Sequence, residues 1–129
     1  MNRQELTKII EDTFESIRLL NITKGEEYSG EDDALANFKR TGKAQNLPPM
    51  KVWAVFAAKH YDAINSFIRN GEVLSEPIEG RIDDLIMYLL LLKGLIADES
   101  KHESKQNLNP FQLYYEEKHK CSGVLKRES

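Results

Sequence analysis

Two carboxylates four residues apart, Glu79 and Asp83, are the first candidates for chemistry in this sequence. On a helix this spacing places both side chains on one face. Such oxygen donors suit Mg²⁺, which usually keeps several waters and also contacts substrate phosphates. The same acids can instead cap a helix and interact favourably with its dipole. Because the most apolar stretch of the chain follows Asp83, an inward carboxylate at this point requires a metal ion or a lysine as its partner.

A second candidate site consists of Lys59 and His60, which interrupt an otherwise apolar segment. A lysine can hold a phosphate as a point charge, and a histidine can donate a hydrogen bond or act as a general acid or base near neutral pH. Alternatively, Lys59 extends to solvent and His60 is a hydrogen-bonded core residue.

A third group of polar and aromatic residues lies earlier in the chain. Asn37 can hydrogen-bond a base or a sugar, and Tyr28 or Phe38 can stack on a base. The cations of this group that can contact phosphates are Lys24, Lys39 and Arg40. Each of these residues is also compatible with core packing or a solvated charge. The sequence contains no glycine-rich phosphate loop and no serine-nucleophile signature.

Four predicted helices position these residues. Apolar residues recur at steps of three and four over residues 3–21, which predicts the first helix. A break follows at residues 23–30, where two glycines flank an acidic, aromatic stretch that suits a loop or a short helical turn. Further helices are predicted over residues 32–44, 49–70 and 81–99. The last is apolar around most of its circumference and is expected at the centre of a bundle. The expected fold class is therefore all-α, an antiparallel bundle of about four helices.

The predicted helical domain covers residues 1–97. Residues 98–129 follow as a polar linker and a C-terminal docking segment or tail, whose aromatic cluster at residues 111–115 can dock onto the bundle or onto a second subunit. A homo-oligomer is expected, since dimerisation would bury excess apolar surface on the third and fourth helices.

Composition limits the range of functions. A length of 129 residues suits one domain, and 18 Lys and Arg against 21 Asp and Glu give a net charge of −3, which argues against general nucleic-acid binding. A single cysteine, Cys121, excludes an internal disulfide and favours a reducing compartment. The longest apolar run, residues 85–92, is too short to span a membrane, and the amino terminus does not resemble a signal peptide. We therefore expect a cytoplasmic location and no membrane partner.

The order of the motifs resembles a known family. The motifs are Lys24-Gly-Glu-Glu27-Tyr28, Asn37-Phe38-Lys39, Lys59-His60, and Asp83 with Tyr88-Leu89-Leu90. They resemble the nucleotide-modification-associated domain found in many phage genomes, which is similar in outline to the MazG-like all-α nucleotide pyrophosphohydrolases. The resemblance covers residues 9–97.

This resemblance implies a nucleoside phosphate hydrolase or binder, acting on nucleotide pools or modified bases in the cytoplasm of a phage-infected bacterium. It implies Mg²⁺ or Mn²⁺ as the cofactor of an enzyme, bound by Glu26 or Glu27 together with Glu79 and Asp83. Of these, Glu27 and Asp83 are the expected catalytic residues. It also implies a nucleotide-binding set that consists of Lys24, Tyr28, Asn37, Phe38, Lys39, Lys59 and His60.

The acids also depart from the MazG-like pattern. MazG-like enzymes resemble one another in acidic pairs three residues apart, whereas Glu79 and Asp83 are four apart. This difference favours an alternative, in which an oligomeric protein without turnover sequesters a cyclic nucleotide signal and thereby inhibits an anti-phage defence. Such a protein needs phosphate-binding cations and stacking aromatics but no metal. A helical adaptor that binds another protein through Tyr114 and Tyr115 is a third hypothesis.

Overall fold

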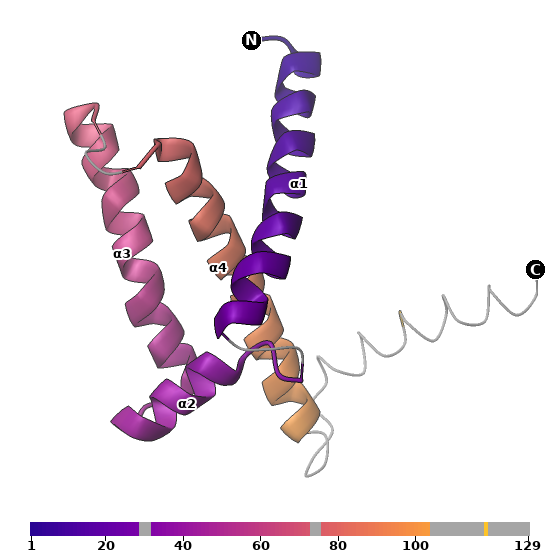
Figure 1. Cartoon of the computed structure of the whole chain (residues 1–129), viewed down its shortest axis with the longest axis vertical. Coiled ribbons are helices and arrows are strands. Elements are labelled where there is room, and N and C mark those ends of the chain that lie inside the picture. Colours follow the sequence, from indigo (N-terminus) through magenta and orange to yellow (C-terminus); the bar gives the residue numbers. More distant parts are fainter. Residues whose placement is uncertain (29–31, 73–75, 104–117, 119–129) are drawn as a thin grey trace, which may run out of the picture. The chain divides into compact units, whose positions relative to one another are not determined.

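The computed structural model describes residues 1–28, 32–72, 76–103 and 118. These residues form four helices and no strand, which confirms the predicted all-α class (Figure 1). The helices are α1 (Arg3–Tyr28), α2 (Ala36–Gln45), α3 (Pro49–Asn70) and α4 (Ile78–Glu103). The chain falls into two units, Met1–Leu95 and Ile96–Ser129, and the packing described below is that of the first. The predicted roles of the aromatic cluster at 111–115 and of Cys121 lie outside the described residues, and the predicted boundary at residue 97 stays a prediction.

Helix α1 is longer than the sequence predicts. It continues to Tyr28, so the predicted end at residue 21 is wrong, and the predicted break over 23–30 is wrong for its described part. A glycine inside a helix costs about 1 kcal/mol relative to alanine, and the good helix formers on both sides of Gly25 outweigh that cost. Within this extension, the Thr23 hydroxyl donates to the Leu19 carbonyl at 2.9 Å, which is the contact that threonine commonly makes inside a helix.

Helix α2 begins four residues later than predicted because Asp33 forms a turn ahead of it. Asp33 Oδ1 accepts the Leu35 N–H at 3.0 Å, an arrangement that competes with helix formation. Gly42 in α2 approaches the start of α3 so closely that a Cβ at this position would lie 2.5 Å from the Leu47 carbonyl oxygen. The α2–α3 corner therefore requires a glycine.

Helix α3 matches its predicted bounds. Pro49 opens the helix, as the sequence predicts. Gly71 ends it with φ 73°, and the Gly71 N–H donates to the Phe67 carbonyl at 2.7 Å. Because side chains strain this left-handed conformation, glycine is the suitable residue here.

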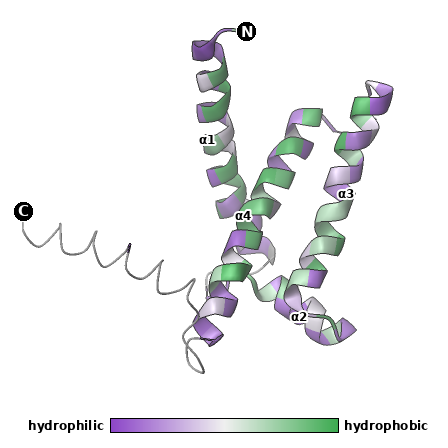
Figure 2. Ribbon diagram, turned by 180° about the vertical axis from the view of Figure 1, so that it is seen from behind, coloured by the Kyte–Doolittle hydropathy of each residue, from purple (hydrophilic) through white to green (hydrophobic). Residues whose placement is uncertain are grey.

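Helix α4 starts three residues earlier and ends four residues later than predicted. It lies between α1 and α3 in both ribbon views (Figures 1 and 2) and is apolar along much of its length. Only Leu95 among its residues is fully buried, while Ile82 and Leu89 are 40% and 49% exposed. α4 lies between α1 and α3 and also packs against α2, which agrees with the central position predicted for it. Its apolar circumference is nevertheless not fully covered by these helices.

The core joins α2, α3 and α4. Its buried members are Leu35, Phe38, Val52 and Leu95. Phe38 packs against two rings, those of Phe56 at 6.1 Å and Tyr88 at 6.3 Å between centroids. The Trp53 indole N–H on α3 donates to the Tyr88 carbonyl oxygen on α4 at 2.6 Å. This hydrogen bond stabilises the packing of α3 against α4. No helix in the described part of the chain is long and apolar enough to cross a membrane.

Candidate functional site

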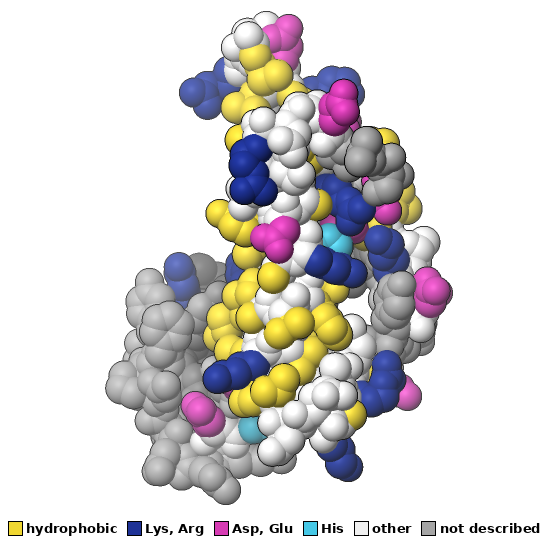
Figure 3. All heavy atoms as spheres, turned by 90° about the vertical axis from the view of Figure 1, so that its left-hand side faces the viewer, with side chains coloured by type: hydrophobic (Ala, Val, Ile, Leu, Met, Phe, Trp, Pro, Cys, Tyr) yellow, Lys and Arg dark blue, Asp and Glu magenta, His cyan; other side chains and the backbone are white. Residues whose placement is uncertain are grey.

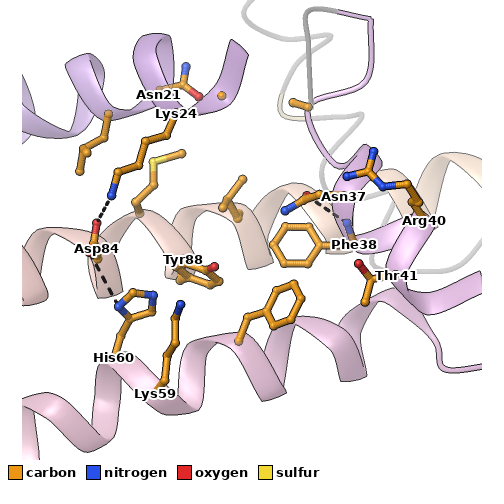
Figure 4. A pocket seen from close by; sticks show the side chains of 16 residues that line it. Asn21, Lys24, Asn37, Phe38, Arg40, Thr41, Lys59, His60, Asp84 and Tyr88 are labelled. Atoms are coloured by element: carbon orange, nitrogen blue, oxygen red, sulfur yellow. Dashed lines mark hydrogen bonds and ion pairs between the residues drawn. The ribbon is translucent and has the colours of Figure 1, made fainter. Parts of the chain in front are cut away.

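A pocket of about 440 Å³ opens between the four helices of the first unit (Figure 4). This volume falls within the range of small-molecule sites, roughly 300–1,000 Å³. Three aromatic rings, those of Phe38, Phe56 and Tyr88, form its apolar floor. The core that supports these rings therefore also shapes the pocket.

The pocket is rich in positive charge. Lys24, Arg40 and Lys59 line it from α1, α2 and α3, whereas Asp84 is its one carboxylate among the described residues. Neither Arg40 nor Lys59 has an ion-pair partner within the ranges that the structure describes. On the face seen in Figure 3, Lys and Arg side chains gather around a histidine. The pocket is thus locally cationic although the chain carries a net charge of −3.

Asp84 on α4 connects two of the other helices. Its Oδ1 accepts a hydrogen bond from Lys24 Nζ at 3.1 Å, and its Oδ2 lies 3.8 Å from His60 Nδ1. The first contact is a charge-assisted hydrogen bond, whereas the second is too long for a direct one. One hydroxyl or water-sized group can contact both His60 Nδ1 and Asp84 Oδ2.

His60 is the one buried polar residue of the described core, with 6% of its surface exposed. Burial lowers the pKa of His60 below its ordinary 6.5, since the charged form loses solvation. Asp84 opposes this shift, while nearby Lys59 lowers the pKa further. His60 Nδ1 has no hydrogen-bond partner among the described residues, and the ring packs on Tyr88 at 4.8 Å between centroids. At neutral pH the imidazole is therefore uncharged and able to accept a proton.

The structure brings together five of the predicted nucleotide-binding residues. Those that line the pocket are Lys24, Asn37, Phe38, Lys59 and His60. Asn21, Thr41, Asp84 and Tyr88 also line it, although none is among the predicted site residues. The sequence gives a partial signal for Asp84 and Tyr88: with Leu91 and Leu95 they recur at steps of four and three, which places all four on one face of α4. The spacing alone does not show that this face is the packed one.

Tyr28 and Lys39, two other predicted nucleotide-binding residues, do not line this pocket. Lys39 Nζ instead lies 2.8 Å from Asp33 Oδ2, in the turn that precedes α2. This hydrogen bond, together with the one from the Leu35 N–H, lowers the pKa of the Asp33 carboxyl. Lys39 thus has a structural partner in the chain, and its contact with a nucleotide stays a prediction.

The predicted metal ligands do not form a common site in the described residues. No three His, Cys, Asp or Glu side chains there are grouped so that they could hold a metal ion. Burial raises the pKa of Asp83, and the neighbouring charges of Asp84 and Glu79 raise it further. Glu79 and Asp83 therefore interact as predicted for a helix, but Glu27 does not complete a donor set with them. The Mg²⁺ or Mn²⁺ site stays a prediction.

Comparisons with protein-family models, curated proteins and solved structures find no match to this chain.

Proposed function

We propose that this chain binds a nucleoside phosphate in the pocket between α1, α2, α3 and α4. The observation that carries the proposal is the convergence of Lys24, Arg40 and Lys59 from three helices on an aromatic floor. Separated cations suit an anion with several oxygens, such as a phosphate chain, because each oxygen can accept a hydrogen bond from a different side chain. Arg40 and Lys59 have no ion pair in the described chain to break before they contact the ligand.

The remaining lining residues fit a base and a sugar. The exposed edges of Phe56 and Tyr88 offer an apolar surface for a base, and the Asn37 amide on α2 can hydrogen-bond its polar edge. The motif resemblance to the phage nucleotide-modification-associated domain supports the same ligand class. In this proposal the protein acts on nucleotides in the cytoplasm of an infected bacterium.

Hydrolysis of the bound nucleotide is a second candidate function, and the Asp84–His60 arrangement favours it. An uncharged, buried histidine whose Nδ1 faces a carboxylate can take a proton from a water molecule while that water attacks phosphorus. The bond from phosphorus to the leaving phosphate oxygen then breaks, and the leaving oxygen takes the electron pair. Lys59 and Lys24 would stabilise the charge that develops on the phosphate oxygens.

The first experiment tests binding and turnover separately. The purified full chain is titrated by calorimetry with ribonucleoside and deoxyribonucleoside triphosphates, cyclic di- and trinucleotides, and inorganic triphosphate. Release of phosphate and pyrophosphate is measured in parallel, with and without Mg²⁺ or Mn²⁺. Lys59→Ala is the test variant, and Lys8→Ala is its matched control because Lys8 is exposed on α1 and pairs only with Asp12 there.

The outcomes separate the hypotheses. A nucleotide that binds the unmodified chain and the Lys8→Ala control, but binds Lys59→Ala weakly, supports the proposed site. A linear nucleotide that is consumed assigns an enzyme, whereas a cyclic nucleotide that binds and stays intact assigns the sequestering alternative. If no member of the panel binds, nucleotide recognition by this pocket is refuted.

A further inference from the structure

A regular apolar stripe runs along the face of α4 that does not line the pocket. Its members, Ile78, Ile82, Leu85, Leu89 and Leu92, follow one another at alternating steps of four and three, and Ile96 continues the same spacing. This is the repeat of a helix–helix seam, in which every residue of the stripe points at one partner helix. The pocket-lining residues of α4, such as Asp84 and Tyr88, occupy a different face of the helix.

The stripe is left partly uncovered by the first unit of the chain. Ile82 is 40% exposed and Leu89 is 49% exposed, and both lie in the interior of the stripe rather than at its end. Ile78, Leu85 and Leu92 are half-buried, so the exposed surface of the stripe is concentrated at Ile82, Leu89 and Ile96. Exposed aliphatic side chains aligned in this way mark interaction surfaces.

The order of residues along the stripe is nearly the same in both directions. With Ile96 included, the steps are four, three, four, three and four from either end. The residue types are also nearly symmetric, with isoleucine at both ends and leucine in the middle. A stripe of this kind can pair with an antiparallel copy of itself, with Leu85 against the partner's Leu89 and Ile82 against the partner's Leu92. Isologous pairing of this type is how two-fold dimers form.

The charges beside the stripe fit the same arrangement. Glu79 and Lys93 are both exposed and flank the stripe on one side of the helix. In an antiparallel pair with Leu85 opposite the partner's Leu89, Glu79 lies close to the partner's Lys93, and Lys93 lies close to the partner's Glu79. Each dimer would therefore gain two favourable charge pairs at the rim of an apolar seam.

We propose that a second copy of this chain covers the stripe, with the two α4 helices antiparallel and Glu79 paired to Lys93 across the two-fold axis. The proposal names the surface and the register of a homodimer. It does not rest on the nucleotide site, because the stripe and the pocket use different faces of α4.

Sedimentation equilibrium of the full chain tests the surface. Leu89→Asp is the test variant, and Ile68→Asp is its matched control because Ile68 is an aliphatic residue on α3 that is 72% exposed. We expect the unmodified chain and the Ile68 variant to be dimeric. Leu89→Asp should raise the dimer dissociation constant by roughly a hundredfold or more, because it places two charges in the seam. Circular dichroism should show unchanged helix content in both variants, since neither residue is buried.

Charge reversal tests the register. Glu79→Lys and Lys93→Glu should each weaken the dimer by roughly three- to tenfold, and the double variant should restore it. A monomeric chain at all concentrations, or a dimer that Leu89→Asp leaves intact, overturns the proposed surface. A dimer that Leu89→Asp dissociates, but in which the double charge reversal gives no recovery, overturns the antiparallel register.

Discussion

Replacing Asp84 by asparagine should make phosphate ligands bind more tightly. The change removes the pocket's one carboxylate charge among the described residues and keeps nearly the same shape. A phosphate oxygen bonded to Lys24 Nζ would lie within about 6 Å of Asp84, because Lys24 Nζ is 3.1 Å from Asp84 Oδ1 and a charge-assisted hydrogen bond adds about 2.8 Å. At that distance the repulsion between two unit charges is about 3 kcal/mol at an effective dielectric constant near 20, and about 0.7 kcal/mol in water. The dissociation constant should therefore fall by roughly 3- to 100-fold.

The assay is calorimetric titration of the unmodified chain and Asp84→Asn with inorganic triphosphate and with the nucleoside triphosphate that binds best. Both probes carry the phosphate charges on which the calculation depends, so both should gain affinity, and the gain should shrink as salt is added. A turnover assay on the same variant separates the two proposed functions, because a hydrolase that uses Asp84 loses activity while its affinity rises. Unchanged or weaker binding of both probes, in a variant that unfolds at the same temperature as the unmodified chain, would refute the electrostatic reasoning.

Three further changes test other parts of the structure. Lys59→Ala should raise the dissociation constant for the same triphosphate by roughly 10- to 100-fold, whereas Lys39→Ala should change it less than about twofold, and calorimetry that gives equal losses would contradict the geometry of the pocket. The chain should lose stability as pH falls below 6.5, the ordinary pKa of histidine, because burial lowers the pKa of His60 and the unfolded chain then binds a proton that the folded chain does not. Urea unfolding should show this loss between about pH 7 and pH 5, and His60→Asn should make the curve flatter. Gly42→Ala should lower the free energy of unfolding by about 1–3 kcal/mol, since its Cβ would lie 2.5 Å from the Leu47 carbonyl oxygen, and an unchanged urea midpoint would show that the corner relaxes without cost.

The fold class was predictable because helix periodicity is a local signal. The proline at the start of α3 and the glycine after its end determine the bounds of that helix, and both lie in the sequence itself. The extension of α1 to Tyr28 was not predictable in the same way, because Gly25 carries a helix-breaking tendency that its neighbours outweigh. The exposure of Leu89 on α4 was not predictable either, because it depends on how many helices pack around α4. The apolar content of a helix does not specify that number.

The candidate site was predictable for residues whose chemistry is evident in the sequence. Lys59 and His60 interrupt an apolar helix, and both line the pocket. Asp83 and Asp84 are adjacent acids that lie on different faces of α4. Which of them lies beside His60 depends on which face of α4 packs in the core, and in the structure it is Asp84. That face becomes apparent once Tyr88 is known to pack in the core, which is a tertiary contact rather than a local pattern.

Because Trp53 donates a hydrogen bond to the Tyr88 carbonyl, its intrinsic fluorescence can serve as a probe of the contact between α3 and α4. Trp53 is the one tryptophan of the chain, and the residue whose backbone it contacts also supplies a ring to the pocket floor. Indole emission shifts to longer wavelength when the ring nitrogen exchanges a protein acceptor for water. The intrinsic fluorescence of the unlabelled protein therefore follows the separation of α3 from α4 in real time, without an attached dye.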